Sequence, residues 1–215
     1  MNPPAVLLAE KRLMIINKPA GLPVHPGRAG GPSVEDFFPL WRLGKDGPWL
    51  AHRLDQDTSG CLVIALKKSA LLEMQFLFSG SLVEKSYWAL VRGVPGQTSG
   101  IIDMPLGKIT TGRSWKMQPV ADAPPAVTHW ALRGAAGGLA WLELSPQTGR
   151  THQLRAHCAA LGHPIAGDTV YGGGGEKMCL MARRISLPMA VPVTATAPVP
   201  PHMAAGLRAC GYDAL

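Results

Sequence analysis

The chain of 215 residues suits one domain or a compact two-lobed one, and it is long enough to bury a substantial core. Hydrophobic residues make up 47% of it, which argues against a disordered chain, and the formal net charge is +7. An excess of Lys and Arg favours polyanionic partners, because each neutralised phosphate releases counterions. Many soluble proteins are also mildly basic, so charge alone leaves both interpretations open.

Cysteine usage and hydropathy bear on the cellular location. The four cysteines form no CxxC pair and have no zinc-finger spacing with histidine, so we expect reduced, mostly packed thiols. The longest apolar runs are interrupted by Lys, Glu, Gly or Pro, and the first residues do not resemble a secretory signal. We therefore expect a cytoplasmic protein with no membrane partner.

The first expected elements are a buried strand and a short helix. Residues 13–17 form an apolar run that a Lys-Pro pair ends, which predicts a strand leading into the Gly/Pro loop of residues 21–31. Ser33 is placed to cap a helix with acidic residues in its first turn, and we expect Pro39 to stop it.

The middle of the chain predicts a strand, a helix, a second strand and a hairpin. The continuous apolar run 61–66 is typical of a buried strand. Ser69 then caps a helix with one apolar stripe, and Gly80 closes it. Residues 85–93 alternate as a strand, and residues 107–120 predict a basic hairpin.

Two further strands and a helix follow. Residues 127–132 and 139–144 predict strands joined by a Gly/Ala-rich turn at 133–138. Thr151 is placed to cap a helix that Gly162 stops.

The end of the chain completes the expected fold. It becomes Pro-rich from Pro188, and a last short helix is expected from His202. Strands with interspersed helices and no regular βαβ alternation predict an α+β fold with a largely antiparallel sheet. We expect a single domain over residues 1–215.

The densest polar cluster runs from His52 to Gly60, between two apolar segments. A loop in that place holds polar side chains at a strand edge, where a cleft can form. An ordinary Asp/Ser/Gly turn is the simpler interpretation, but Arg53 and Asp55 bracket a leucine, which fits a plain turn less well.

A second cluster, residues 147–157, carries two arginines and two histidines around a predicted helix start. Helix N-termini attract anions, although a solvated basic face would look the same. A third feature is Lys85-Ser-Tyr87, where a strand tyrosine is more often a core or interface residue than a catalytic one.

These segments resemble the RluA-type pseudouridine synthases. The signature pieces appear in order over about residues 13–201, nearly the whole chain: Asn17-Lys-Pro-Ala-Gly-Leu-Pro-Val-His25-Pro; His52-Arg-Leu-Asp-Gln-Asp-Thr-Ser-Gly60; Lys85-Ser-Tyr-Trp-Ala-Leu-Val-Arg-Gly93; Thr148-Gly-Arg-Thr-His-Gln-Leu-Arg-Ala-His157; and Leu161-Gly-His-Pro-Ile-Ala-Gly-Asp168, followed by Tyr171.

The resemblance implies one pseudouridine-synthase catalytic domain around a bent, mixed, largely antiparallel sheet, with an RNA-binding cleft. It implies an isomerase that acts on uridine in structured tRNA or rRNA, with no cofactor and no metal. The catalytic motifs begin almost at once, so no separate N-terminal RNA-binding module is expected. We expect RNA as the partner and a monomeric protein.

The resemblance also gives roles to individual residues. It implies that Asp55 is the essential carboxylate, that Arg155 pairs with it, and that Tyr87 packs on the target base and is a candidate to move the carbon-five proton. A nearby cation orients a carboxylate and lowers its pKa. Arg53 fills the space of the extruded nucleotide, since the base must leave its stack. The remaining expected RNA contacts are His52, Lys85, Arg150, His152 and, on the basic hairpin, Arg113.

Two other ligand sites are disfavoured by spacing. His152 and His157 are five apart, so they do not share a helix face as an HExxH pair does, and we expect no metal site. The Gly172–Gly175 run lacks the GK[ST] of a phosphate loop. Where many relatives have Leu-His-Ala, this chain has Met181, for which packing is the simplest role.

Two other functions stay in view. An RNA chaperone or assembly factor with the same fold would also explain the charge, but it has no need of Asp55. A hydrolase that uses Asp55 with His52 lacks any oxyanion-hole or metal pattern. The sequence does not identify the RNA, the uridine, or the covalent or glycal route.

Overall fold

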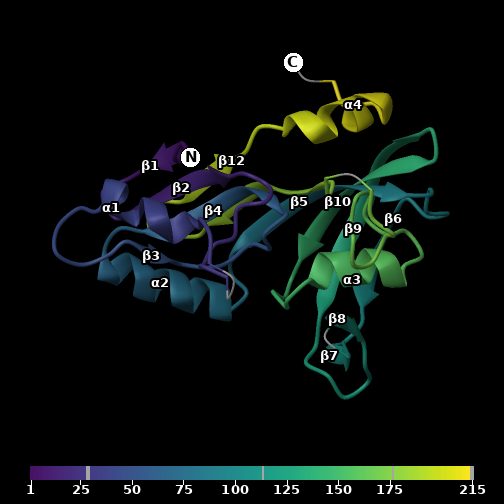
Figure 1. The fold of residues 1–215 in the computed structure, drawn as a ribbon, viewed down its shortest axis with the longest axis horizontal. Helices are drawn as coiled ribbons and strands as arrows, with labels where there is room; N and C mark the ends of the chain where they lie inside the picture. Colours follow the sequence, from purple (N-terminus) through teal and green to yellow (C-terminus); the bar gives the residue numbers. More distant parts are fainter. Residues whose placement is uncertain (28–29, 113, 176, 214–215) are drawn as a thin grey trace. The chain divides into compact units, whose positions relative to one another are not determined.

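The computed structural model describes residues 1–27, 30–112, 114–175 and 177–213 (Figure 1). The chain folds into two compact units. The first unit comprises Met1–Lys85 and Ala182–Pro198, and the second comprises Ser86–Met181 and Val199–Leu215. The expectation of one catalytic domain over residues 1–215 stays a prediction.

The first unit is built on buried antiparallel strands. β1 (Ala5–Ala9) pairs with β2 (Leu13–Lys18), and β2 pairs with β4 (Ser59–Ala65). Short β3 (Trp49–Leu50) also pairs with β4. Every residue of β4 is buried, as its unbroken apolar run predicts, although the strand begins two residues earlier than expected.

Two more strands of the chain form an antiparallel pair near its end. β11 (Leu180–Leu187) pairs with β12 (Val193–Thr196), and neither strand was predicted from the sequence. The prolines 188 and 192 lie in the connection between the two strands, where neither interrupts the ladder.

The helices of the first unit differ in detail from expectation. η1 (Val34–Phe37) is a 3₁₀ turn that continues into α1 (Phe38–Trp41), so the prediction that Pro39 stops the helix is wrong. Proline is tolerated in the first turn of an α-helix, where its missing N–H would have had no partner.

The amphipathic helix α2 (Lys68–Ser79) lies where it was expected and ends at Gly80. Its N-cap is Lys67 rather than Ser69, which corrects that prediction by two residues. The buried residues Ala70, Met74 and Leu77 form the stripe against the sheet.

The second unit holds an antiparallel run in the order β5 (Glu84–Arg92), β10 (Leu139–Pro146), β9 (Val127–Ala136) and β6 (Ser99–Asp103). The predicted turn at 133–138 is wrong, because β9 continues to Ala136.

A bulge and two glycines explain this longer strand. Leu142 pairs with Leu132 and Trp141 with Gly134, so Arg133 is an extra residue in the ladder. The turn is reduced to Gly137-Gly138, with φ of +58° and +78°, the pair of positive values that a tight hairpin requires.

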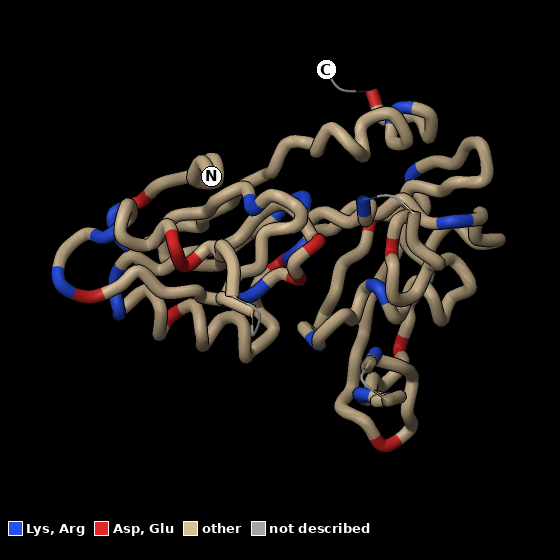
Figure 2. The backbone as a smooth tube through the Cα atoms, in the orientation of Figure 1, with Lys and Arg blue, Asp and Glu red and all other residues tan. Residues whose placement is uncertain are grey.

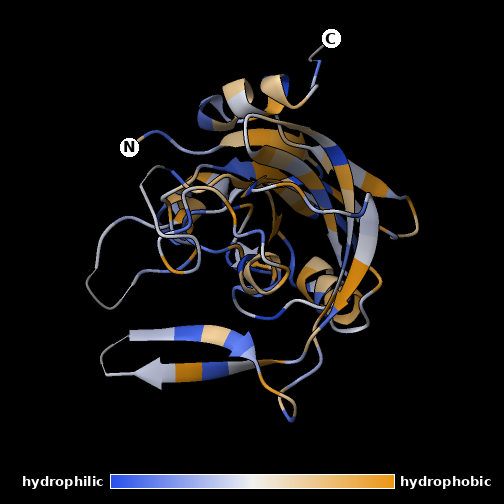
Figure 3. Ribbon diagram, turned by 90° about the vertical axis from the view of Figure 1, so that its right-hand side faces the viewer, coloured by the Kyte–Doolittle hydropathy of each residue, from blue (hydrophilic) through white to orange (hydrophobic). Residues whose placement is uncertain are grey.

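The predicted basic hairpin is confirmed as β7 (Leu106–Thr111) and β8 (Ser114–Pro119), which form a separate two-stranded sheet. Arg113, the expected RNA contact at its turn, lies outside the described residues. Figure 3 displays the hairpin as two strands on which hydrophilic and hydrophobic residues are mixed.

The helices of the second unit are α3 (Gln153–Ala160) and α4 (Pro201–Ala209). The N-cap of α3 is His152, so the prediction of a Thr151 cap is wrong, whereas Gly162 follows its end in the expected left-handed conformation. Helix α4 begins one residue before the expected His202.

The α+β fold class with largely antiparallel strands is confirmed. The four cysteine side chains are all buried. Among the described residues, no helix has the length and apolarity to cross a membrane. The expected RNA-binding cleft stays a prediction.

Candidate active site

The loop between β3 and β4 carries the predicted catalytic carboxylate, Asp55. Leu54 is 5% exposed and anchors the loop in the core, while its neighbour Arg53 is exposed. The backbone oxygen of Asp55 accepts a hydrogen bond from the Thr58 N–H at 3.2 Å, which closes a tight turn. The Asp55 side chain itself is partly buried.

The buried ammonium of Lys18 holds the next residue of this loop. Its Nζ donates to the backbone oxygens of Pro19, Leu22 and Gln56 at 3.0, 2.8 and 2.8 Å, and the residue is 0% exposed. Gln56 also accepts from the Gly21 N–H at 3.0 Å. The loop that presents Asp55 is therefore tied to the end of β2 one residue beyond the carboxylate.

The position of Lys18 has an electrostatic consequence. Burial lowers its pKa to about 7, against the attraction of the Asp57 and Asp55 carboxylates. Three carbonyl acceptors match the three N–H groups of the charged amine, one more than the neutral amine has.

The last residue of the same motif, Gly60, has to be a glycine for a structural reason. Its φ is +107°, and a Cβ there would lie 2.2 Å from the backbone oxygen of Ala182. A side chain is excluded on both grounds, so the glycine lets β4 pass close to β11 just after the loop that carries Asp55.

The His52 ring is held by a hydrogen bond and by a stacked aromatic ring. Its Nε2 accepts a hydrogen bond from the Val63 N–H at 3.0 Å, and its ring stacks on Phe78 at 4.5 Å between centroids. Burial lowers its pKa to about 3, and the charge of Lys85 acts in the same direction. A ring already committed to Val63 is a poor general base, which weakens the hydrolase interpretation. The assignment of His52 to RNA binding stays a prediction.

Strand β5 carries the other two predicted residues of the middle motif. Tyr87 is partly buried and lies opposite Leu144 of β10. Lys85 is also partly buried, and burial lowers its pKa.

In the second unit, Gln153 fixes the approach to α3. Its Oε1 accepts from Thr148 Oγ1 at 2.7 Å and from the Arg150 N–H at 3.0 Å, and its Nε2 donates to the oxygen of Val127 at 3.0 Å. Arg150 is exposed, and its Nε donates to the Pro125 oxygen.

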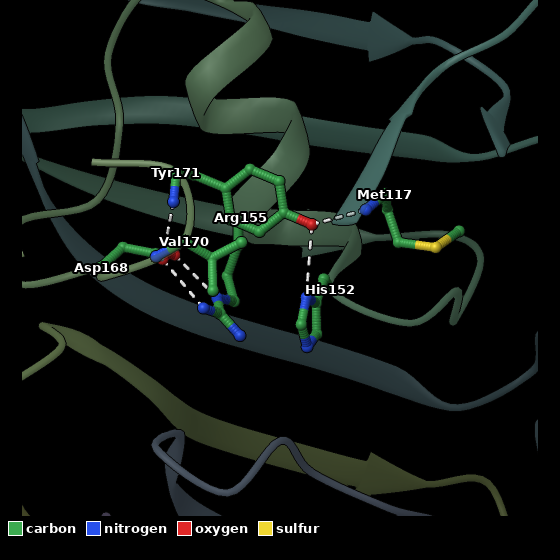
Figure 4. Close-up of polar contacts among 6 residues, drawn as sticks. All are labelled: Met117, His152, Arg155, Asp168, Val170 and Tyr171. Carbon is green, nitrogen blue, oxygen red and sulfur yellow. Dashed lines mark hydrogen bonds and ion pairs between the residues drawn. The ribbon is translucent and has the colours of Figure 1, made fainter. Parts of the chain in front are cut away.

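Arg155 on the first turns of α3 forms a buried ion pair with Asp168 (Figure 4). Its Nε and Nη2 donate to Oδ2 and Oδ1 at 2.7 and 2.8 Å, and Asp168 is 0% exposed. Burial alone would raise the pKa of Asp168, but the hydrogen bonds and charge of Arg155, with the N–H groups of Val170 and Tyr171, hold it below its ordinary value.

Tyr171 connects this pair to His152 and the hairpin, as Figure 4 displays. Its ring lies 5.4 Å from the Arg155 guanidinium carbon, and its hydroxyl accepts from the Met117 N–H of β8 at 2.8 Å. The same hydroxyl lies 3.2 Å from His152 Nδ1.

His157 has a packing role. Its ring nitrogens lie 3.0 Å from Thr128 Oγ1 and 3.1 Å from the Met104 oxygen, and it is 0% exposed. Across residues 1–27, 30–112, 114–175 and 177–213, no group of three or more His, Cys, Asp or Glu side chains is arranged to hold a metal ion.

The structure brings His152 and Arg155 together through Tyr171, and places His52 near Lys85. Asp55 belongs to the first unit, and Tyr87 and Arg155 belong to the second, so the expected pairing of Asp55 with Arg155 stays a prediction.

Sequence reasoning missed the roles of Lys18, Gln153, Asp168 and Tyr171, although all four lie in the quoted motifs. Lys18 and Gln153 could have been identified as charged or amide residues within an otherwise apolar or tightly turning segment.

Comparisons with known proteins show the family of this chain. The family model described as RNA pseudouridylate synthase matches residues 12–160. An uncharacterised RNA pseudouridine synthase of Zymomonas mobilis is 41% identical over 204 residues, which cover 91% of this chain and 93% of that one. The solved structure of human RNA pseudouridylate synthase domain containing 4 superposes with a TM-score of 0.82 at 27% identity, over 98% of this chain and 94% of that one.

Several relatives are longer. The ribosomal large subunit pseudouridine synthase D of Nitrosomonas europaea is 36% identical over 176 residues, which cover 79% of this chain and 50% of that protein. The matches likewise span 66% and 51% of the uncharacterised RNA pseudouridine synthases of Synechocystis and Chloroflexus aurantiacus.

Proposed function

The chain belongs to the RNA pseudouridylate synthase family, and from that premise we propose that it converts specific uridines to pseudouridine in structured transfer or ribosomal RNA. The isomerisation breaks the bond between uracil N1 and the ribose, turns the base, and forms a carbon–carbon bond from C5. The C5 proton is lost and N1 gains one, so no oxidant or energy source is consumed.

Asp55 is the residue on which this proposal depends. A carboxylate at the sugar must be ionised to attack it or to assist loss of a proton from it. The anchoring of Leu54 and the hold of Lys18 on Gln56 support this role, because both fix the backbone on either side of Asp55. A fixed backbone presents the carboxylate in one orientation.

Arg155 is proposed to orient Asp55. A guanidinium beside a carboxylate orients it and keeps it ionised, which is the role proposed for Arg155. The buried pair with Asp168 stiffens Arg155, which suits a residue that must hold its partner at a fixed angle.

Tyr87 is proposed to pack on the extruded uracil and to move the C5 proton. The exposed Arg53 is proposed to occupy the space that the nucleotide leaves, since base extraction requires replacement contacts. His52, Lys85, Arg150 and His152, with Arg113, are proposed RNA contacts.

Ribosomal RNA is one of the two substrate classes in this proposal. The Nitrosomonas europaea relative is named for the large ribosomal subunit, which supports a ribosomal substrate for that protein. The net charge of +7 suits either RNA.

The assay is release of tritium from RNA labelled at C5 of uridine. We expect the purified protein to release label from transfer or ribosomal RNA, and the Asp55→Ala variant to release none. The matched control is Asp57→Ala, because Asp57 is an exposed carboxylate two residues away in the same loop. We expect Asp57→Ala to keep most of the wild-type rate.

The same variants separate the enzyme from an RNA chaperone. If wild type released no label from total RNA while a known synthase did so in parallel, turnover would be rejected. If Asp55→Ala left the modified RNA and cell growth unchanged while RNA binding persisted, a binding-only function would replace the proposal.

A further inference from the structure

The hairpin β7–β8 presents a tryptophan at its surface. Trp115 is 40% exposed, and its indole stacks on the His152 ring at 4.9 Å between centroids and 24° between planes. The Nζ of Lys108 lies 4.8 Å from the indole centroid. Trp115 pairs with Thr110, so Lys108, two residues from Thr110, shares its face of the hairpin.

His152 has an unusual backbone conformation where α3 begins. Its φ is +52°, in the left-handed region, although an N-cap residue normally has an extended backbone. Non-glycine residues hold that conformation where surrounding contacts determine it, and such strain concentrates at functional sites. The contacts of the His152 side chain include the Trp115 indole and the Tyr171 hydroxyl.

A hydrogen bond from β8 to Tyr171 holds the hairpin in place. The Tyr171 hydroxyl accepts from the Met117 N–H, and Met117 lies two residues from Trp115 on β8. The indole is thereby held in place before any ligand arrives, which lowers the entropy lost on binding.

The charge of the hairpin indicates the kind of ligand. Residues 106–119 contain Lys108, Arg113 and Lys116 and neither Asp nor Glu. Figure 2 displays blue positions on the hairpin, at the place where Figure 1 labels β7 and β8. An exposed aromatic ring among cations is the combination that binds single-stranded nucleic acid, because every base offers a π-face and every linkage a phosphate.

We propose that Trp115 is a stacking site for an unpaired base of the RNA substrate, with Lys108 beside it to contact the adjoining phosphate. This proposal rests on the proposed function and deepens it, because it gives the hairpin a defined role in holding an unpaired stretch of that RNA. The flexible Lys108 side chain leaves the indole when the phosphate arrives, and the base takes its place against the ring.

The test compares two strands of equal charge. One is a ten-nucleotide oligouridylate and the other a ten-unit abasic ribose-phosphate strand, each bound to the full-length protein. We expect wild type to bind oligouridylate more tightly than the abasic strand. Trp115→Ala should weaken oligouridylate binding by about tenfold and leave abasic binding unchanged, while Trp115→Phe keeps most of the affinity.

Two further variants serve as controls. Ile109→Ala changes a residue of equal exposure, 40%, on the opposite face of the hairpin and should alter neither affinity. Lys108→Ala should weaken the binding of both oligomers, oligouridylate and abasic. It should also reduce the slope of log affinity against log salt concentration by about one.

The stacking site would be rejected if wild type bound both oligomers with equal affinity, or if Trp115→Ala reduced both affinities to the same extent. It would also be rejected if Trp115→Phe lost as much affinity for oligouridylate as Trp115→Ala. These binding measurements need no turnover. Tritium release by wild type is measured separately, so failure of the proposed function is distinguished from failure of the stacking site.

Discussion

The guanidinium of Arg155 and the carboxylate of Asp168 face each other edge to edge, with two hydrogen bonds of 2.7 and 2.8 Å in a site closed to solvent. The two residues are 13 apart in the sequence and come from α3 and the loop that follows it. A buried charge is tolerated when an opposite charge lies beside it, and an unpaired one destabilises the folded state. Arg155 therefore depends on Asp168 for its geometry.

Asp168→Asn is expected to destabilise the protein by about 3 kcal/mol, because it removes the buried carboxylate charge that offsets the Arg155 guanidinium. The measurement is the urea midpoint of unfolding. The matched control is Glu73→Gln, which breaks the solvent-exposed pair with Arg12 at 2.8 Å and should cost less than about 1 kcal/mol. If the two variants lost equal amounts of unfolding free energy, the argument that burial makes the Arg155–Asp168 pair more important than the exposed pair would be contradicted.

Lys18 predicts a dependence of stability on pH. Its pKa is about 7 in the folded protein and 10.5 for the ordinary side chain, so between these values the unfolded chain binds more protons. The penalty for burying the charge is complete below pH 7 and is relieved as the pH rises. Relative to Lys18→Met, wild type should gain up to about 1.4 kcal/mol of stability per pH unit in this interval.

This prediction is checked by urea unfolding of both proteins at pH 6, 8 and 9.5. Below pH 7 the difference between them should be constant, since Lys18 is charged in both the folded and the unfolded states. Should the Lys18→Met variant not fold, the ¹³Cε shift of Lys18 in wild type reports the same titration directly. A midpoint near 10.5 would contradict the lowered pKa.

Gly60→Ala is expected to prevent normal folding of the first unit. The new Cβ would lie 2.2 Å from the backbone oxygen of Ala182, and neither backbone can yield without separating the strands. Gly21→Ala is the control, because Gly21 also has a positive φ, +88°, but no atom within 4 Å of the added Cβ. That variant should lose about 1 kcal/mol and remain soluble. Thermal unfolding of the soluble fraction compares them.

Tyr87→Phe separates base packing from proton transfer. The ring remains, so binding of the RNA should change little, whereas loss of the hydroxyl should lower the single-turnover rate by about 100-fold if that oxygen moves the C5 proton. Quench measurements at saturating RNA give the rate, and titration gives the affinity. A weakened affinity at an unchanged rate would instead assign Tyr87 to binding alone.

Local patterns were sufficient to predict much of the fold. The apolar runs of β2 and β4 and the stripe of α2 follow from hydrophobic periodicity, and the closures at Gly80 and Gly162 follow from the backbone freedom of glycine. The errors at Pro39, Ser69, Thr151 and the turn at 133–138 concern element ends, where several caps or turns compete within a few residues. The strands β1, β3, β6, β11 and β12 were not predicted at all.

By itself the sequence determined the family, because the motifs around Asp55 and Arg155 keep their residues and order, and it determined the α+β class, because periodicity is a local property. The tertiary structure alone decided that Lys18 is buried on three carbonyls, that Asp168 holds Arg155, and that Trp115 stacks on His152. These contacts join residues from separate elements, and their energies depend on burial and orientation, which arise when the chain closes on itself.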